Sequence, residues 1–414
     1  MRRHFRSTLT LVWAALGAAV ARGAAAQEPP AEQTPPAASK DPLAPETPLP
    51  RETPVEIAIA RPRISGSAFG GYGELTLNVP SGSPGVLDLR RAVLYFGHDF
   101  SDRIRFYSEV EIEHAVSSAD DQGEVEIEQA YLDGLLDRRI NLRGGVIIMP
   151  VGIVNVYHEP PSFNGVDRPD VDTLVVPSTW REPGVGIFGE LAEGLRYQLY
   201  VVNGLNANGF SAESAIRGGH QEAQRARAGD VGGVLRLDYE PVLGTVFGLS
   251  GYGATSRNSL PASIGSVPVG LFEADFRARL GGFSARLEAA VLLVGDAGPL
   301  NQALAAGDDE QKLAVPVSSQ SRGGYAEAAY DLMRLLAPSS QQSVTAFARF
   351  DYVDTQAAVP SGFQSRMELR RTSEVLGVVY RPIPQVALKA DYRRRQFGVG
   401  SDTDEVASAI TWLF

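Results

Sequence analysis

The sequence of 414 residues contains no cysteine. Disulfide frameworks, thiolate metal sites, cysteine nucleophiles and lipid attachment to an N-terminal cysteine are therefore excluded. Lysine is scarce: Lys40, Lys312 and Lys389 are the only lysines among 38 basic residues, which excludes a lysine-dependent phosphate-binding loop. The formal net charge of −11 argues against a nucleic-acid partner held by bulk electrostatics.

No apolar run reaches the roughly 18 residues that a transmembrane helix needs. A shorter apolar stretch, residues 9–20, follows a basic start and precedes three alanines that end at Ala26. This pattern predicts a cleaved signal peptide over residues 1–26, with a buried N-terminal helix as the alternative. Residues 27–63 contain ten prolines and are expected to form a proline-rich linker, either a periplasmic arm or a disordered tail.

From residue 64 to residue 414 apolar and polar side chains alternate. In the last segment Val406, Ser408, Ile410, Trp412 and Phe414 fall on one face, as in a strand with one apolar side. A soluble β-sandwich alternates too. A transmembrane barrel is favoured because the polar face is charged in one strand after another and because short turns alternate with long connections. We predict an all-β, antiparallel transmembrane barrel of about 16 strands over residues 64–414.

Seven motifs between residues 66 and 204 resemble the family of phosphate-selective porins O and P. They are FGGYGE (69–74), RAVLYFGHDFSDRIRF (91–106), SEVEIEH (108–114), GEVEIEQA (123–130), PVGI (150–153), HEPP (158–161) and PSTW (177–180). The resemblance implies a sixteen-stranded, usually trimeric outer-membrane channel whose long third outer loop folds into the lumen. Here that loop is residues 150–181. The family's named members pass phosphate through a constriction lined by arginine and lysine.

Strand alternation predicts two charged walls in the lumen. The basic wall comprises Arg105, Arg143, Arg236, Arg277, Arg279, Arg286, Arg349, Lys389, Arg393 and Arg395. The acidic wall comprises Glu109, Glu111, Glu113, Glu124, Glu126 and Glu128. Opposed walls set a field across a pore, whereas acids and bases on neighbouring strands can also pair and stiffen the wall. Both interpretations stay open.

The predicted constriction loop contributes its own charged residues. They are His158, Glu159, Asp167, Arg168, Asp170, Asp172 and Arg181. Arginine suits phosphate because its fixed fork of donors matches phosphate oxygens. This loop has two arginines, no lysine and a majority of acids, which departs from the family's pattern and leaves phosphate selectivity open. The aspartates lack the spacing of a calcium-binding loop, so we expect them in a solvated loop.

No metal and no cofactor is predicted. His98, His114 and His158 stand beside acids, but only His114 and His158, with Glu159, lie where an inward loop would bring them together. For His158 a hydrogen bond that docks the loop is the favoured role. The GxGxxG pattern of residues 184–189 is set aside, because it lies in a strand with no helix after it.

We predict an exported bacterial porin in the outer membrane, in contact with lipid and assembled as a homotrimer. It would let small hydrophilic solutes or inorganic anions diffuse passively, with no enzymatic activity. A plugged structural or adhesive barrel is the alternative. A rim hydrolase built on His114 with Ser117 and Ser118 lacks a third partner, and a sugar porin would need a longer line of lumen aromatics.

Overall fold

A computed structural model describes residues 63–64, 67–115, 123–256, 264–306 and 315–414. The predicted signal peptide, nearly all of the proline-rich linker, and Ser117 and Ser118 lie outside these ranges.

Sixteen antiparallel strands, β2 to β17, form one closed barrel. They are β2 (Ser67–Pro80), β3 (Val86–Asp99), β4 (Ile104–Glu113), β5 (Val125–Leu135), β6 (Asn141–Ile148), β7 (Arg181–Ala192), β8 (Leu195–Asn203), β9 (Val231–Val242), β10 (Thr245–Ser256), β11 (Val267–Leu280), β12 (Phe283–Val294), β13 (Gln320–Asp331), β14 (Ser343–Ala358), β15 (Arg370–Ile383), β16 (Val386–Phe397) and β17 (Thr403–Leu413). A short strand, β1 (Arg63–Ile64), pairs with the start of β2. The predicted all-β barrel is confirmed.

The barrel closes where the last strand meets the first. Each strand pairs with its neighbours in sequence, and β17 returns to β2 in a register that sets Trp412 opposite Gly73. Backbone hydrogen bonds of 2.8 and 3.0 Å between Phe414 and Gly71 complete this seam. Closure leaves no open sheet edge, which a barrel inside hydrocarbon requires.

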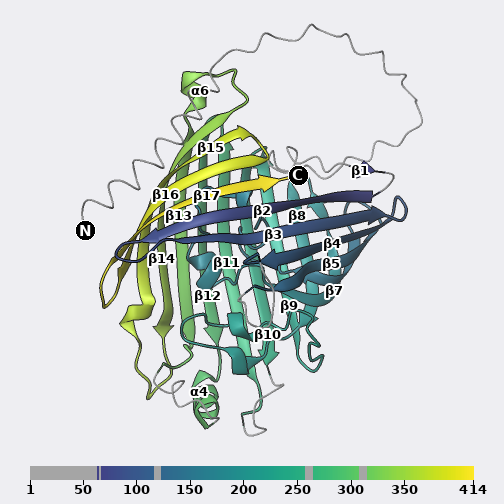
Figure 1. Cartoon of the computed structure of the whole chain (residues 1–414). Helices are drawn as coiled ribbons and strands as arrows, with labels where there is room; N and C mark the ends of the chain where they lie inside the picture. The colour runs from purple at the N-terminus through teal and green to yellow at the C-terminus, as the bar shows by residue number, and fades with distance from the viewer. Residues whose placement is uncertain (1–62, 65–66, 116–122, 257–263, 307–314) are drawn as a thin grey trace. The chain divides into compact units, whose positions relative to one another are not determined.

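The two ends of the barrel differ in the length of their connections. One end, called the turn end, carries the C-terminus and short turns, together with α6 (Met333–Leu336) between β13 and β14 (Figure 1). The opposite end, called the loop end, carries the long connections. These include α4 (Ala297–Ala306) and η4 (Met367–Leu369). Within the described ranges, no helix is both long and apolar enough to cross a membrane.

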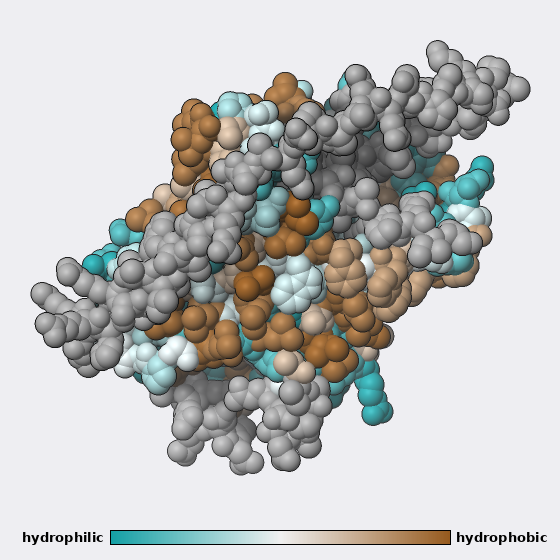
Figure 2. Space-filling view, turned by 45° about the horizontal axis from the view of Figure 1, so that its top comes forward, coloured by the Kyte–Doolittle hydropathy of each residue, from teal (hydrophilic) through white to brown (hydrophobic). Residues whose placement is uncertain are grey.

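The outer wall is apolar. Large hydrophobic side chains such as Leu249, Phe272 and Leu376 are about 60% exposed on it (58%, 61% and 60%). Figure 2 shows such side chains gathered over one face of the molecule. The strand sequence Arg393-Arg394-Arg395 illustrates the alternation, since Arg393 is buried inside while Arg394 is exposed outside.

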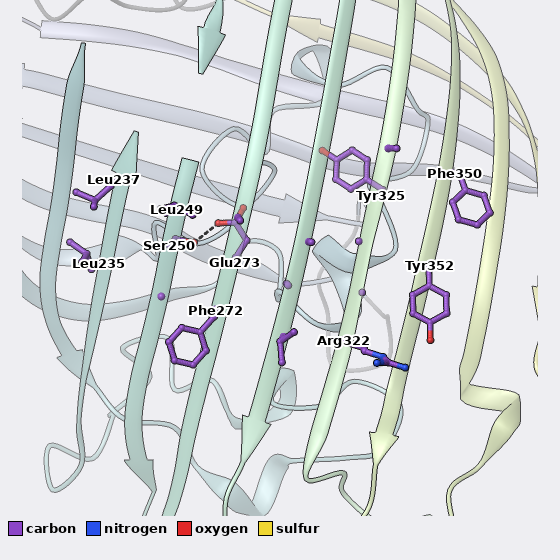
Figure 3. Close-up of a pocket in the computed structure, with 18 residues that line it drawn as sticks. Leu235, Leu237, Leu249, Ser250, Phe272, Glu273, Arg322, Tyr325, Phe350 and Tyr352 are labelled. Atoms are coloured by element: carbon purple, nitrogen blue, oxygen red, sulfur yellow. Dashed lines mark hydrogen bonds between the residues drawn. The ribbon is translucent and has the colours of Figure 1, made fainter. Parts of the chain in front are cut away.

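A hollow of about 930 Å³ lies on this outer wall, across β9 to β14. Small residues such as Ala274 and Gly324 are among those that line it, together with Leu249, Phe272 and Phe350 (Figure 3). Because its borders are exposed and apolar, it faces away from the lumen charges. The hollow is therefore a feature of the barrel's exterior and not the candidate site.

The loops do not project freely from the loop end. The third loop (residues 149–180, here called loop 3) contains η1 (Pro160–Ser162) and α3 (Val171–Leu174). The fourth (residues 204–230, here called loop 4) contains η2 (Ala207–Gly209) and η3 (Arg217–Gly219). Trp180, Phe210 and Leu300 of α4 belong to one buried apolar cluster with inward-facing residues of β8 to β14. Loop 3 is folded into the lumen, as predicted. The large apolar cluster of loop residues lies on the β8–β14 side, while Val166 of loop 3 packs against Ala407 and Ala409 of β17.

Candidate functional site

The neck of loop 3 is held by one buried amide. Asn155 Nδ2 donates to the carbonyl oxygens of Met149 (2.7 Å) and Trp180 (3.3 Å), and its Oδ1 accepts from the Trp180 backbone N–H (2.8 Å). Met149 and Trp180 flank the ends of β6 and β7, so the side chain ties the two ends of the loop together. This arrangement turns the loop inward and fixes it there.

Four predicted basic-wall residues donate hydrogen bonds to backbone carbonyl oxygens of loop 3: Lys389, Arg286, Arg236 and Arg349. Lys389 Nζ donates to the carbonyl oxygens of Pro160 (2.6 Å) and Gly165 (2.8 Å) and lies 4.0 Å from the centre of the Phe163 ring. Arg286 Nη2 donates to Ser162 O at 2.6 Å. These cations donate hydrogen bonds that hold loop 3 in place. Their role is therefore structural, and they are not free charges along a passage.

Asp167 and Asp170 bind arginines of the facing wall. Asp167 lies 2.7 Å from both Arg90 Nη1 and Arg393 Nη1. Although burial alone would raise the pKa of Asp167, Arg393 and Arg90 hold it well below its ordinary value. Asp170 receives two hydrogen bonds from Arg371, at 2.7 and 2.9 Å. The expectation of solvated aspartates is therefore wrong, because the inward fold of loop 3 carries them against the arginines of β3, β15 and β16.

Around these pairs lies a polar cavity of about 250 Å³, here called the arginine pocket. It is lined by Glu74, Arg90, Arg91, Phe163, Asp167, Arg168, Asp170, Thr173, Ser178, Arg217, Arg371, Arg393 and Arg395. Seven of these residues are arginines and three are carboxylates, so the pocket has an excess of positive charge.

Three guanidinium groups of the pocket have N–H donors that make no hydrogen bond to the described residues. Among the described residues, Arg393 Nε and Nη2, Arg91 Nε and Nη1, and Arg395 Nε are buried with no hydrogen-bond partner. Buried donors left unpaired cost free energy, and an anion with several oxygen atoms would satisfy more than one of them. Burial and, second, the charge of the neighbouring Arg91 lower the pKa of Arg168 to about 10.

A β-bulge explains why alternation did not assign Arg90 and Arg91. The register between β2 and β3 shifts so that Glu74 faces Arg91 while Leu75 faces Leu89, leaving Arg90 as the extra residue. The contacts of both arginines are inside the barrel: Arg90 binds Asp167, and Arg91 lies 3.8 Å from Glu74. One inserted residue thus sends two consecutive arginines to the same face.

The remaining basic wall is paired with acids on the same or neighbouring strands. Arg236 contacts Asp238 (2.9 Å), Asp275 (2.6 Å) and Glu273 (3.5 Å). The other pairs, each N···O distance in parentheses, are Arg277 with Asp238 (2.8 Å), Arg349 with Asp351 (2.9 Å), Arg143 with Asp133 (2.8 Å), Arg105 with Asp99 (3.3 Å) and Arg395 with Glu405 (3.8 Å). Carboxylates therefore stand within the predicted basic wall, and neighbouring strands pair as the second interpretation described.

One residue falls outside the predicted walls. Glu124 is exposed before β5 begins, which corrects the predicted lumen lining. The error arises because alternation was extended beyond the start of the strand, into residues that lead out of a loop. Arg279 is exposed at the turn end of β11, in phase with the inward-facing Asp275 and Arg277.

Most glutamates of the predicted acidic wall are buried or half-buried, so they are not open to solvent in the lumen. Glu109, Glu111 and Glu128 are buried, Glu113 is half-buried, and Glu126 binds Arg181. A second bulge, between the Glu109–Gln129 and Val110–Ile127 pairs, inserts Glu128.

The three histidines beside acids do not come together. His114 is paired with Asp88 at 2.9 Å, and His98 accepts or donates a 2.8 Å hydrogen bond with Ser67. His158 is buried beside Glu109 and Glu128, and Glu159 next to it is half-buried. The proposed meeting of His114 with His158 is therefore wrong.

Asp172 is the least compensated acid of loop 3. It is fully buried near Glu273 and Glu288, and neither carboxylate oxygen has a hydrogen-bond partner of good geometry among the described residues. Burial, reinforced by the charge of Glu273, raises the pKa of Asp172 to about 7. The folded state therefore holds a proton here that the unfolded chain releases near its ordinary pKa.

The variant Asp172→Asn should stabilise the barrel at pH 8. Because its pKa is higher in the folded state than in the unfolded chain, Asp172 lowers the free energy of unfolding. This loss increases as the pH rises from about 4 to about 7 and is constant above that. Asparagine removes this cost, so the gain in the free energy of unfolding should be largest above pH 7 and vanish near pH 4. Urea unfolding of refolded protein at several pH values measures it. A gain that does not depend on pH would contradict the assignment.

Sequence reasoning missed four arginines of the pocket. Arg90 and Arg91 were hidden by the bulge, and Arg217 lies in loop 4, where alternation gives no information. Arg371 could have been predicted from the sequence, because it is in phase with the inward-facing Ser373 and Val375 of the same strand.

No model of a known protein family matches the chain. A protein of Aquifex aeolicus, described as uncharacterized, is 34% identical over 358 residues, which cover 84% of this chain and 80% of that protein. The chain belongs to the same family as this Aquifex protein. No activity follows from this membership, since the relative's description gives none.

Solved porin-like structures share the fold at low identity. OmpF of Salmonella typhi has a TM-score of 0.56 at 12% identity, over 84% of this chain and 97% of that one. An anion-selective porin from Comamonas acidovorans has a TM-score of 0.54 at 9% identity, over 84% of this chain and 99% of that one. OmpT of Vibrio cholerae, an outer membrane protein in a trimer form, has a TM-score of 0.51 at 9% identity, over 84% of this chain and 99% of that one. These likenesses show a porin-like barrel, and none of the three is described as phosphate-selective.

Proposed function

We propose that this protein is an outer-membrane porin through which small hydrophilic solutes diffuse passively, with a preference for inorganic anions. The observation that carries the proposal is the arginine pocket, which lies between loop 3 and the wall formed by β2, β3, β15 and β16. An excess of guanidinium groups along a passage lowers the energy of an anion and raises that of a cation. The proposal includes no enzymatic step.

The barrel suits a bilayer on physical grounds. Its backbone hydrogen bonds are satisfied between strands. Its outer wall carries many large apolar side chains, and its buried charged side chains lie on the inner face. The proposal also takes residues 1–26 as the export signal, and a homotrimer as the assembled form. A trimer form is described for the OmpT barrel, and for this chain it remains part of the proposal.

The plugged barrel is a second candidate, and one observation favours it. Loop 3, loop 4 and α4 join inward-facing strand residues in an apolar cluster that fills the β8–β14 side of the lumen. If the loops fill the whole cross-section, no ion passes. The porin proposal requires that a path remain on the opposite side, through the arginine pocket.

Single-channel recording separates the two candidates. Refolded protein in a planar bilayer with a KCl gradient should give discrete current steps and a reversal potential whose sign indicates chloride preference, with a permeability ratio of about 3 or more. Absence of steps from folded protein would favour the plugged barrel. Steps with potassium preference would keep the channel but contradict the anion preference.

Phosphate added in the same recording tests the finer claim. Phosphate oxygens can accept the spare donors of Arg91 and Arg393. Residence of phosphate in the pocket should then reduce the chloride current in a concentration-dependent manner. Unchanged current would leave an anion-preferring porin without a phosphate site.

A further inference from the structure

Three buried side chains meet where loop 3 touches the wall of β4 and β5. They are Glu109 of β4, Glu128 of β5 and His158 of loop 3, with exposed fractions of 2%, 0% and 2%. One ligand atom of each lies within 4.8 Å of the other two. The three belong to different motifs of the sequence, and the inserted residue of the β5 bulge is Glu128 itself.

The distances in this cluster do not fit hydrogen bonds. His158 Nε2 lies 3.5 Å from Glu128 Oε2 and 3.7 Å from Glu109 Oε2, beyond the usual range of about 2.7–3.2 Å. His158 Nε2 has no hydrogen-bond partner in the part of the chain that the structure describes. By contrast, neighbouring ligands of a tetrahedral zinc ion, each about 2.0–2.1 Å from the metal, are about 3.3 Å apart.

Neighbouring groups hold the imidazole and the two carboxylate oxygens that face it. His158 Nδ1 lies 3.3 Å from the carbonyl oxygen of Asn155. A neutral imidazole that keeps its proton on Nδ1, toward this oxygen, presents the Nε2 lone pair to the two carboxylates. Gln129 Nε2 donates to Glu109 Oε2 (2.8 Å), and the Tyr72 hydroxyl donates to Glu128 Oε2 (3.0 Å). Such outer contacts orient and tune metal ligands.

We propose that Glu109, Glu128 and His158 bind a divalent transition-metal ion of the zinc type, which clamps loop 3 to the barrel wall. One imidazole and two carboxylates favour zinc and its neighbours over calcium or magnesium, which need six or more oxygen ligands. The two carboxylate charges balance the ion. None of the three ligands lines the arginine pocket, although Arg168 of the pocket donates to the His158 carbonyl oxygen at 3.5 Å. The ion would hold loop 3 in place, which is a function beyond solute passage.

A protonated imidazole is the competing occupant of this position. Burial lowers the pKa of His158, but Glu128 and the other nearby carboxylates raise it, with a net value of about 9. An imidazolium would carry only one positive charge against two carboxylates, and at 3.5 and 3.7 Å it donates no good hydrogen bond from Nε2. The two occupants predict opposite results when Zn²⁺ is added. If the site is a metal site, Zn²⁺ binds and a proton is released; if a permanent imidazolium fills the position, Zn²⁺ does not bind.

Isothermal titration of the refolded full-length chain, first stripped by a chelator, tests the proposal directly. Zn²⁺ at pH 7.5 should bind with 1:1 stoichiometry, whereas Mg²⁺ and Ca²⁺ should not bind. His158→Ala should weaken Zn²⁺ binding by at least about 100-fold, since loss of an outer contact alone costs 10–100-fold. His114→Ala is the matched control, because His114 is exposed and paired with an acid outside this cluster, and it should leave binding unchanged.

Conservative variants guard against a folding defect in His158→Ala. Glu109→Gln and Glu128→Gln keep the side-chain shape and remove one negative ligand each, so both should weaken Zn²⁺ binding while the far-ultraviolet spectrum stays that of a β-barrel. No 1:1 binding to the unaltered chain would overturn the proposal, and so would equal binding by all three variants, which would mean a surface ion. Neither result depends on conductance, so the porin proposal is tested separately.

Discussion

Replacing Arg393 and Arg395 together by glutamine should lower the anion-to-cation permeability ratio about tenfold. Both residues line the arginine pocket, and both have buried guanidinium nitrogens with no hydrogen-bond partner among the described residues. An anion in the pocket therefore interacts with two cations that the variant removes. The reversal potential in a KCl gradient measures the change.

Coulomb's law sets the size of this effect. A unit charge about 8 Å from an ion, at an effective dielectric constant of about 40, contributes about 1 kcal/mol. That energy is about a fivefold change in a partition coefficient for each arginine. Two arginines would give about 25-fold without salt, and screening at about 0.1 M reduces the expectation to about tenfold.

The residue between them provides a matched control. Arg394 lies on the outer face of the same strand, exposed and paired with Asp402 at 3.1 Å. Arg394→Gln removes the same charge from the same segment of β16, but the wall separates it from the lumen. It should leave the permeability ratio unchanged. An equal shift in both variants would mean that selectivity is set by net charge and not by the pocket.

The second large effect is expected on the outer face. Phe272→Arg should destabilise the barrel in a lipid bilayer by about 2–4 kcal/mol, the cost of a cation at the midplane of a membrane barrel. Phe272 is 61% exposed and borders the outer hollow. In a water-soluble barrel an arginine at so exposed a position would be neutral or favourable. Urea unfolding in phospholipid vesicles gives the free energy.

An arginine outside the strands controls for the added charge. Ser339 is exposed in the connection between β13 and β14 at the turn end. Ser339→Arg should change the free energy of unfolding by less than about 0.5 kcal/mol. If Phe272→Arg were equally harmless in vesicles, the outer wall would not face hydrocarbon, and the membrane assignment would fail.

The strand arrangement could be predicted because it depends on local patterns. Alternation identifies a strand with two different faces, and the contrast of short and long connections orders the strands into a barrel. Alternation does not mark where a strand begins, which is why Glu124, just before β5, was placed in the lumen.

The details of the site could not be predicted, for two physical reasons. Bulges at Arg90 and Glu128 change the phase of a strand by one residue, and nothing in the residue types announces them. Loop contacts join segments far apart in sequence: Asp170 meets Arg371, and Asp167 meets Arg393. Of these four residues, alternation placed only Arg393 on the lumen wall, and it could not identify the partners of any of them.

The uneven filling of the lumen has a consequence for how such a protein changes over time. Apolar loop residues occupy the side of β8–β14, whereas the arginines of the pocket come mainly from β3, β15 and β16. Substitutions that repack the loops would adjust the width of the remaining passage, and substitutions on the three strands would adjust its charge. Because loop 3 also contributes Asp167, Arg168 and Asp170 to the pocket, a loop substitution can change the width and the charge of the passage together, whereas a strand substitution changes mainly its charge.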